Sequence, residues 1–461
     1  MSEYKCTVCQ YIYNENDEEI SFDDLSNDWK CPICNSSKDA FVLEDKNISF
    51  EIRKKYEDEH KEVYETYRDL KHMAYTGESV VKSMGSLKEL PFNFNDLNFV
   101  PAQIYKVPLN KEESVDSKFV FGKSADKPLV LDSPILMSAI SYGAVSAKVR
   151  QIISEVARVN NIGFNTGEGG VLDSDVRPDS PVIIQYATGR FGVSEELLGK
   201  ASAIEIKIGQ GAYPGKGSFL PHDKIDADLA KIRGLGSGED AYSPARHPDI
   251  NNHEELNAKV RYLKDVGGGV PVGAKIACGD IERDITTLVD AGVDFITIDG
   301  FGGGTGATNS FIRDNVGIPL IAGLPRAVKC LEGLGVRDSI TLMVSGTLRT
   351  SADVGKALAL GADGVYLGTT TLIGLGCQQY RQCHEGTCSN GIATSDSKLI
   401  ENLEFEFSVK TLTNLMLVLN EELRMLARVM GKDSVGSFTC DDLVSLNRDL
   451  ADVLGVKWLM G

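Results

Sequence analysis

Seven of the ten cysteines in this 461-residue chain occur in two patterns whose spacing suits metal chemistry. Three of them lie in the stretch CQQYRQCHEGTCSNGIAT, where Cys377, Cys383 and Cys388 have the spacing C-x5-C-x4-C. Three thiolates can bind an iron–sulfur cluster that lacks one iron, or a zinc ion with His384 as its fourth ligand. They can also be unliganded, buried thiols. The spacing by itself leaves all three interpretations open.

The other four cysteines form two C-x2-C pairs near the start of the chain. Cys6 stands with Cys9 and Cys31 with Cys34, and four thiolates on two turns suit a tetrahedral iron or zinc site. Spacing alone favours zinc, but the residues around the pairs favour iron. Those residues, mostly aromatic, are Tyr4, Tyr11, Tyr13, Trp29, Pro32 and Phe41.

These neighbours resemble those of rubredoxin, in which a tyrosine precedes the first pair, two aromatic residues follow it, and the second pair reads W-x-C-P-x-C. The resemblance implies a single iron on four thiolates, which carries one electron. The chain departs from it at Gln10 and Asn35, where rubredoxins usually have glycine. Asparagine tolerates a left-handed backbone, and glutamine does so less well. A structural zinc ribbon stays the alternative.

Two lysines near the ends of apolar segments are candidates for a different chemistry. Lys207 lies in IEIKIGQG and Lys275 lies in VGAKIACG. A lysine buried at such a place needs an anionic or hydrogen-bonding partner. A reduced flavin, which is negative near its N1 atom, is one such partner. A carboxylate within the same fold is the other.

Gly-rich turns follow three of the apolar segments. The turns MVSGTLRT and YLGTT offer a phosphate the backbone N–H groups of Ser345, Gly346, Gly368 and Thr369. The turn IDGFGGGTGA resembles a dinucleotide-binding loop only weakly, because it lacks a downstream acidic partner in a clear βαβ frame.

The elements that must position these residues are eight short apolar segments that alternate with helical patterns. The predicted strands are 134–137, 163–167, 182–187, 203–208, 272–277, 294–299, 339–346 and 363–368. Eight βα units in about 240 residues indicate an α/β protein with a (β/α)8 TIM barrel, and a doubly wound sheet is the alternative. A long insertion at about 209–250 follows the fourth strand. The loops after the seventh and eighth strands are the usual phosphate site of such a barrel.

Three parts of the chain are predicted. Residues 1–45 form a small rubredoxin-like metal domain, which is too small to fold well on its core alone. Residues 46–129 form a helical connector and a pre-barrel segment, in which FEIRKKYEDEHKEVYETYRDLKHMAY predicts a surface helix. Residues 130–461 form the barrel domain, with an Fe–S segment at 376–394 and C-terminal helices.

Several stretches, taken in order, resemble the central FMN-binding synthase domain of glutamate synthase. They are MSAISYGAVS, NTGEGG, ATGRFGVS, IKIGQGAYPGKGSFLP, GGGTGA and GCQQYRQCHEGTCSNGIAT, and together they span about residues 130–430. The resemblance implies that Cys377, Cys383 and Cys388 bind a 3Fe-4S cluster beside FMN. It also implies that reduced FMN passes a hydride to the imine formed from 2-oxoglutarate and ammonia, which gives L-glutamate.

The resemblance also implies which residues form the site. The catalytic residues would be Glu168, Lys207 and Lys275. The FMN contacts would be Ser141, Gly143, Asn165, Glu168, Gln185, Lys207, Gly303, Gly304, Ser345, Gly346, Gly368 and Thr369. The substrate-binding residues would be Gln210, Tyr213, Lys216, Arg233 and Arg246.

The sequence departs from the family near the substrate. Tyr213 stands where the family has a lysine close to the substrate carboxylate, and Lys216 stands where it has a glutamate. Losing one charged hydrogen bond costs about 1–3 kcal/mol. Lys216 or Arg246 is a candidate to take over the carboxylate. Alternatively, the substrate is a different imine, oxo acid or amine, or the chain is an electron-relay subunit of a larger complex.

No segment of the sequence matches the glutaminase, β-helix or pyridine-nucleotide domains that accompany this synthase domain elsewhere. We therefore expect a divergent, stand-alone synthase that takes electrons from a separate donor, a ferredoxin or a reductase. We expect ammonia to come from solution or from a separate glutaminase subunit. We also expect a homo-oligomer.

Composition limits the other function classes. A net charge of −18 argues against a nucleic-acid partner, which would need a basic face. No apolar run approaches the roughly 20 residues of a membrane span, and MSEYKCTVCQ has no apolar signal segment. We therefore expect a cytoplasmic protein without a membrane partner. In that reducing compartment, clustered cysteines are metal ligands rather than disulfides.

Overall fold

The computed structural model describes residues 3–15, 18, 20–43, 60–220, 222–236 and 238–461. The chain divides into two compact units, Met1–Val81 and Lys82–Gly461. Within the described residues, no helix is long and apolar enough to cross a membrane. The predicted surface helix is present as α2 (Lys61–Thr76), and its expected beginning, 50–59, lies outside the described residues.

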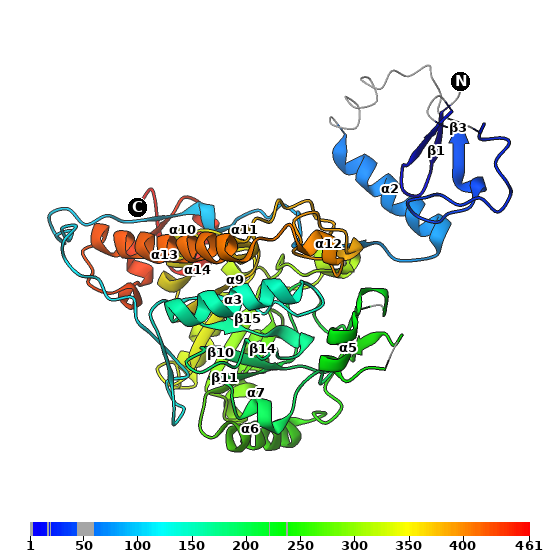
Figure 1. Ribbon diagram of the computed structural model, residues 1–461. Helices are drawn as coiled ribbons and strands as arrows, with labels where there is room; N and C mark the ends of the chain where they lie inside the picture. Colours follow the sequence, from blue (N-terminus) through cyan, green and yellow to red (C-terminus); the bar gives the residue numbers. More distant parts are fainter. Residues whose placement is uncertain (1–2, 16–17, 19, 44–59, 221, 237) are drawn as a thin grey trace. The chain divides into compact units, whose positions relative to one another are not determined.

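The first unit is built around a three-stranded antiparallel sheet (Figure 1). Its strands, in the order β2-β1-β3, are β1 (Glu3–Cys6), β2 (Ile12–Asn14) and β3 (Phe41–Leu43). The buried core of this unit consists of Cys6, Tyr13, Phe22, Cys31 and Phe41. Two of these five core residues are metal-type ligands, so a metal is expected to complete the small core.

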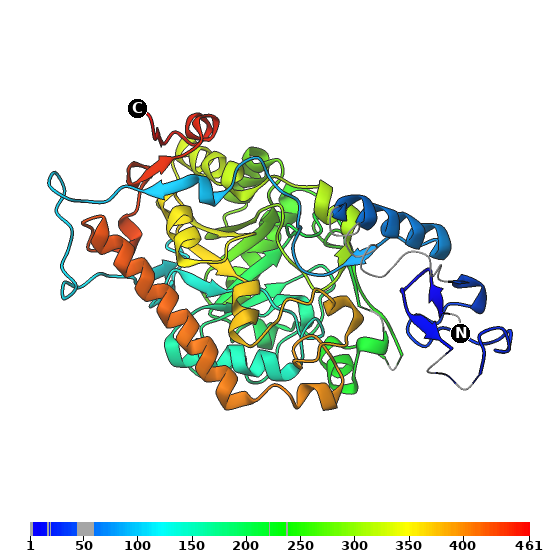
Figure 2. The same cartoon turned by 90° about the horizontal axis from the view of Figure 1, so that it is seen from above.

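The second unit is a closed barrel of eight parallel strands, ordered β10-β11-β14-β15-β17-β18-β8-β9 (Figures 1 and 2). The strands are β8 (Ile135–Met137), β9 (Phe164–Asn165), β10 (Val182–Tyr186), β11 (Ala203–Lys207), β14 (Val272–Ala277), β15 (Phe295–Asp299), β17 (Thr341–Ser345) and β18 (Gly364–Leu367). Every predicted strand is found, and the TIM-barrel prediction is confirmed. The strands are buried on both faces, which explains why their sequences are continuous apolar runs.

The barrel interior is arranged in layers of different chemistry. At one end, the hairpin of β6 (Phe119–Phe121) and β7 (Leu129–Leu131) packs its apolar side chains against inward residues of the barrel strands. Phe121 contacts Phe295 with ring centroids 4.4 Å apart. Alternate residues of a strand face the same side, so Ala203, Glu205 and Lys207 of β11 all point inward. The barrel interior is therefore apolar at the amino end of the strands and polar at their carboxyl end.

Helices surround the barrel strands (Figure 2). They are α3 (Ala147–Asn160), α4 (Glu195–Leu198), α6 (His253–Gly267), α7 (Ile281–Asp290), α8 (Ser310–Asn315), α9 (Leu320–Gly333), α10 (Ser351–Ala359), α11 (Thr369–Gly374), α12 (Ser397–Ile400), α13 (Phe405–Val429) and α14 (Arg448–Leu454). The long helix α13 is amphipathic and is one of the predicted C-terminal helices. It buries Leu412, Met416, Leu419 and Leu423 and packs against α3 and α10.

Short strands lie outside the barrel. A small sheet joins β5 (Leu97–Phe99) to β19 (Leu443–Ser445) and β20 (Lys457–Trp458). Two further short strands are β4 (Val81–Lys82) and β16 (Thr308–Asn309).

The insertion after β11 has structure of its own. It contains the antiparallel pair β12 (Ser218–Leu220) and β13 (Ala241–Ser243), with α5 (Ala227–Arg233) between them. This segment lies at the carboxyl end of the barrel strands, because it leaves β11 after Lys207. It therefore adds side chains to the end of the barrel where such folds place their sites.

Candidate functional site

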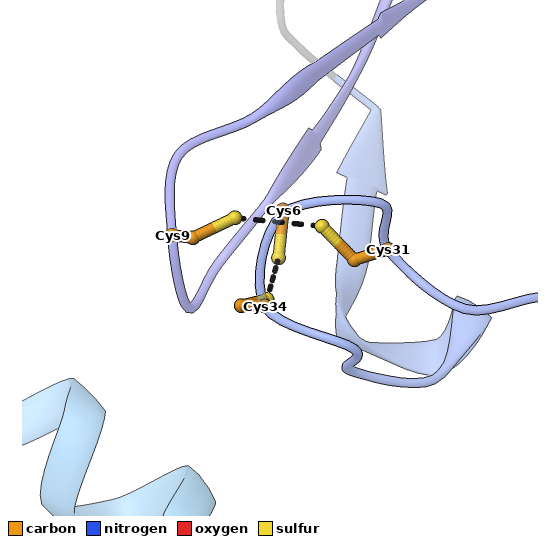
Figure 3. Close-up of side chains that lie close together, drawn as sticks. All are labelled: Cys6, Cys9, Cys31 and Cys34. Carbon is orange, nitrogen blue, oxygen red and sulfur yellow. Dashed lines mark hydrogen bonds between the residues drawn. The ribbon is translucent and has the colours of Figure 1, made fainter. Parts of the chain in front are cut away.

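The four N-terminal cysteines come together, with all their sulfurs within 4.8 Å of one another (Figure 3). Cys6 Sγ lies 3.6 Å from Cys34 Sγ, and Cys9 Sγ lies 3.4 Å from Cys31 Sγ. Four sulfurs about 2.3 Å from one metal in a tetrahedron would be about 3.8 Å apart. The described cysteines are therefore nearly at the spacing that a bound ion requires.

Aromatic side chains enclose this set. Phe22 stacks on Tyr4 with centroids 4.1 Å apart, and it also contacts Tyr13, Trp29 and Phe41. Phe22 lies at the centre of the aromatic core although the sequence analysis did not select it. Phe22 could have been selected because it is an aromatic residue between the two cysteine pairs, in a segment otherwise rich in acidic residues.

The residue that directly follows each cysteine pair has a backbone in the left-handed region. Gln10 has φ 69° and Asn35 has φ 60°. Their N–H groups donate to the carbonyl oxygens of Cys6 and Cys31 at 3.0 and 2.9 Å. The chain therefore keeps the backbone turn that a glycine would form, at a conformational cost that is larger for glutamine.

We expect Gln10→Gly to stabilise the metal-loaded protein by about 1 kcal/mol, because glycine adopts a positive φ without strain. Asn35→Gly is the matched control and is expected to give a smaller gain. Urea unfolding, followed by loss of the metal–thiolate absorption, measures both. A Gln10→Gly variant that loses this absorption at lower urea than the unmodified protein would contradict the strain argument.

A cavity opens at the carboxyl end of the barrel strands, where the sequence analysis placed most of its candidates. The predicted residues that line it are Ser141, Gln210, Tyr213, Lys275, Gly303, Gly304, Ser345, Gly346, Gly368, Thr369, Cys377, Cys383 and Cys388. Side chains and turns from six barrel strands and from the three-cysteine loop thus meet at one space.

Lys207, at the end of β11, forms a buried ion pair. Its Nζ donates to Glu168 Oε2 at 2.8 Å and to Tyr213 Oη at 3.3 Å. Glu168 also accepts from Ser218 Oγ at 2.6 Å and from Ser243 Oγ at 3.4 Å. Burial would raise the pKa of Glu168, but the Lys207 ammonium and the Ser218 hydroxyl hold it below its usual value. Two serines of the insertion thus complete the polar contacts of this pair.

Lys275, in β14, lines the cavity itself. Its Nζ lies 3.7 Å from Asp299 Oδ2, and its side chain is buried. Asp299 is held by Ser345 Oγ at 2.7 Å and by the Gly211 N–H at 2.9 Å. Both predicted lysines therefore have carboxylate partners within the barrel, and Lys275 in addition faces the cavity.

Asn165 and Gln185 lie one layer below the cavity. Asn165 Nδ2 and Gln185 Nε2 donate to Glu205 Oε1 at 2.8 and 2.9 Å, and Thr297 Oγ1 donates to Glu205 Oε2 at 2.8 Å. These residues form a fully hydrogen-bonded polar layer in the barrel, and neither Asn165 nor Gln185 lines the cavity. The Asn165 Oδ1 also accepts from the Gly167 N–H at 2.9 Å, which fixes the turn that carries Glu168.

A second cavity adjoins the first and shares Ser141, Tyr213 and Cys383 with it. Arg233, from α5, lines the second cavity and is 8% exposed. Its Nη2 donates to the Tyr142 carbonyl at 2.7 Å, and its Nε has no hydrogen-bond partner. Burial lowers the Arg233 pKa. A buried guanidinium with an unused N–H is a ready partner for an anion.

Gly143 allows Arg233 to reach this position. It has φ 99°, and a Cβ there would lie 3.0 Å from Arg233 Nη2 and closer still to Leu229 and Leu220. Any larger residue at 143 would therefore displace Arg233 or the insertion.

Lys216 and Arg246 are not brought to either cavity. Lys216 is exposed, and its Nζ donates to Asn309 Oδ1. Arg246 is also exposed and lines a separate pocket beside His247 and Ile250. Lys216 follows a Gly-containing loop whose direction the sequence does not reveal.

The three-cysteine loop lies against the first cavity, but its sulfurs are spread out. Among the described residues, the four N-terminal cysteines are the only group of three or more potential metal ligands that comes together, with all four sulfurs within 4.8 Å of one another. His384 Nδ1 is engaged with Ser83 Oγ at 2.6 Å. A single zinc ion needs all its ligands close together, whereas a cluster holds each thiolate on a different iron. No such compact group forms at the described residues of the three-cysteine loop, so they do not favour a single zinc ion there.

His247 supports the end of β11 from the insertion. It lies against the Lys207 carbonyl, with Nε2 2.8 Å from that oxygen, and its Nδ1 is 2.7 Å from Arg190 Nη1. The neutral ring with a proton on Nε2 satisfies both contacts. Burial and the Arg190 charge lower the His247 pKa to about 4.

We expect this histidine to make the protein less stable in mild acid. The unfolded chain binds a proton at His247 below about pH 6.5, while the folded chain does so only near pH 4. The free energy of unfolding should therefore fall by about 3 kcal/mol from pH 6.5 to pH 4 through this group. In urea unfolding, the free energy of unfolding of His247→Gln should fall less steeply with falling pH than that of the unmodified protein. Exposed His222 provides the control His222→Gln, and parallel curves for all three proteins would contradict the assignment.

Comparisons with known proteins agree with this geometry. A family model described as the conserved region in glutamate synthase matches residues 65–433, and a rubredoxin model matches residues 3–41. The archaeal-type glutamate synthase (NADPH) of Dehalococcoides mccartyi is 34% identical over 98% of this chain and 95% of its own length. The chain belongs to the glutamate synthase family. The archaeal glutamate synthase (NADPH) of Methanocaldococcus jannaschii is 33% identical over the same shares.

Among solved structures, a double mutant of flavocytochrome b2 with pyruvate bound has a TM-score of 0.50. It is 16% identical, and the match covers 85% of this chain and 87% of that one. That similarity shows the barrel fold alone. Membership of the glutamate synthase family makes this protein an oxidoreductase with a rubredoxin-like N-terminal unit, as the sequence predicted.

Two charged residues that line this glutamate synthase cavity were not predicted from the sequence. Asp299 lines the cavity and holds Ser345, and Arg349 lines it from the turn after β17. Asp299 ended a predicted apolar strand, just as Lys207 and Lys275 did, so the same criterion would have found it. Arg349 stood within the quoted turn MVSGTLRT, beside residues that were selected.

Proposed function

We propose that this protein is a glutamate synthase that takes electrons from a separate carrier and reduces the imine of 2-oxoglutarate and ammonia to L-glutamate. One observation carries the proposal. The cavity at the carboxyl end of the barrel joins buried Lys275, the Gly-rich turns after β17 and β18, and three cysteines. A cation, a phosphate cradle and a set of thiolates are what a flavin and a nearby cluster need.

FMN fits the residues that line this cavity. Gly346 has φ 106°, and a Cβ there would lie 2.8 Å from the Gly300 nitrogen, so the turn requires glycine. The N–H groups of Gly346 and Thr369 would hold the phosphate, since the turns after the last two strands are its usual site. Arg349 also lines the cavity and would add a charge. FMN in its reduced form supplies a hydride, and Lys275 would stabilise the negative charge of that form.

Two iron centres would pass electrons to the cavity. We propose a 3Fe-4S cluster on Cys377, Cys383 and Cys388, and a single iron on the four N-terminal cysteines, because the aromatic core there resembles that of rubredoxin. The relatives are named for NADPH, and we propose that a ferredoxin or a reductase delivers electrons to this chain. Ammonia would come from solution or from a separate glutaminase. The thiolate-bound iron suits a reducing, cytoplasmic setting.

The substrate would bind between the two cavities. Arg233 would hold a carboxylate with its guanidinium, since it lines the second cavity, and Gln210 would contact the oxo acid, since it lines the first cavity. Glu168 and Lys207 would keep the wall of the site rigid through their buried pair. A second candidate is a related enzyme for a different oxo acid, which is favoured by Tyr213 in place of a cation and by the outward direction of Lys216.

An oxo-acid panel tests the proposal against both alternatives. The protein is purified without oxygen and supplied with reduced viologen, ammonium and one oxo acid at a time. We expect glutamate from 2-oxoglutarate to form at least about tenfold faster than alanine from pyruvate or aspartate from oxaloacetate, because the second carboxylate adds a charged contact. A faster rate with another oxo acid would support the second candidate. No turnover with any oxo acid would contradict both enzyme candidates and would support the interpretation of the chain as an electron-relay subunit.

A further inference from the structure

Tyr213 lies at the junction of the two cavities. It lines both of them, and its side chain is 8% exposed. A protonated tyrosine has no charge to offer a substrate carboxylate, so its place at the junction needs another explanation. The hydrogen bonds around its hydroxyl provide one.

The phenolic oxygen of Tyr213 lies beside a cationic donor. Lys207 Nζ donates to it at 3.3 Å. An ammonium can donate hydrogen bonds but cannot accept one, so this contact uses an acceptor position of the phenolic oxygen. The phenolic proton is therefore not taken by Lys207, and Tyr213 lines both cavities.

We propose that Tyr213 is the proton donor to the substrate nitrogen, and that Lys207 supports it as a positioning residue. This inference rests on the proposed function. In the step, the C=N π bond of the imine breaks, the carbon receives a hydride from the reduced flavin, and the nitrogen receives the phenolic proton of Tyr213. Water in the adjoining cavity then returns a proton to the phenolate, and the Lys207 ammonium stabilises the phenolate until that transfer.

The charges around Tyr213 suit this role. Burial and the Glu168 charge raise the pKa of Tyr213, so the phenol is protonated and ready to donate at neutral pH. Burial would lower the pKa of Lys207, but Glu168 and Tyr213 hold it above its usual value. The ammonium therefore stays charged beside the phenol and stabilises the phenolate that proton transfer creates.

The test compares Tyr213→Phe with the unmodified holoenzyme. Phenylalanine keeps the ring and removes only the donor. Exposed Tyr242, in the same insertion, provides the matched control Tyr242→Phe. Flavin and iron content show whether each variant is intact. Equilibrium binding of 2-oxoglutarate to the oxidised protein gives a Kd that does not depend on turnover, and a single turnover of the reduced protein is timed in H2O and in D2O.

We expect Tyr213→Phe to slow glutamate formation by about 100-fold or more, the effect typical of a lost general acid. Its Kd for 2-oxoglutarate should stay within about threefold of the unmodified value, because no charged contact is removed. The solvent isotope effect on the single turnover should also change. Tyr242→Phe should change none of these values.

Three results would overturn the inference, and they are distinguishable. If the unmodified protein forms no glutamate, the proposed function fails and the inference fails with it. If the unmodified protein forms glutamate and Tyr213→Phe does so within threefold of its rate, only the inference fails. If the loss in rate is matched by an equal rise in Kd, Tyr213 binds the substrate and does not transfer the proton.

Discussion

Replacing Cys383 with alanine is expected to remove the iron of the three-cysteine site and to abolish most glutamate formation, while the four-cysteine iron stays in place. Cys383 lines both cavities at the carboxyl end of the barrel. A cluster held by three thiolates has no spare protein ligand, so the loss of one thiolate releases it. Iron per chain, together with the electron paramagnetic resonance signal of a three-iron cluster, measures the result.

Two variants control this experiment. Cys31→Ala should show the converse, because it removes a ligand of the N-terminal set and leaves the barrel loop intact. Cys440→Ala should change neither iron centre, since that half-buried thiol donates to the Ala359 carbonyl and lines neither cavity. If Cys383→Ala keeps the full iron content, the three cysteines do not bind a cluster.

Replacing Lys275 with methionine is expected to slow glutamate formation by about 100-fold and to make the flavin harder to reduce. Removing one preorganised charge or donor from a buried site typically costs that factor in rate. The sign of the change in the flavin's reduction potential follows from charge. A reduced flavin is negative, so losing the ammonium destabilises the reduced form and lowers its potential. A reductive titration followed by flavin absorbance measures the potential, and initial rates measure turnover.

Lys356 provides a matched control. It is also a buried lysine, and its Nζ donates to the Phe94 carbonyl at 2.8 Å, away from both cavities. Lys356→Met should therefore share any general loss of stability and leave the flavin potential unchanged. Equal potentials in Lys275→Met and in the unmodified protein would show that Lys275 does not act on the flavin.

The barrel could be predicted from the sequence because its physical signal is local. Parallel strands buried on both faces are continuous runs such as AIEIK and FITID, and each ends at a polar residue or glycine. The four-cysteine site was equally predictable, because two short turns carry all its ligands. In both cases the chemistry and the element lie within a few residues of each other.

The contacts of the barrel site could not be predicted in the same way. Glu168 accepts from Ser218 and Ser243, which are brought to it by the folded insertion. Lys216 is two residues from Ser218, yet its side chain is turned outward to Asn309. Neither direction is encoded by periodicity, because the insertion has few regular elements. Most residues implied by the resemblance lie at the carboxyl end of the barrel, but Lys216 and Arg246 line neither cavity. Only the structure separates the residues that line the cavity from those that support it.

The most direct test of the central claim is a single anaerobic turnover with the flavin fully reduced and the donor removed. The protein is mixed with 2-oxoglutarate and ammonium, and the flavin absorbance and the free glutamate are followed together. The account predicts that the flavin reoxidises with one glutamate formed per flavin, and that it stays reduced when ammonium is omitted. A flavin that reoxidises without glutamate, or that stays reduced with both substrates present, would contradict it.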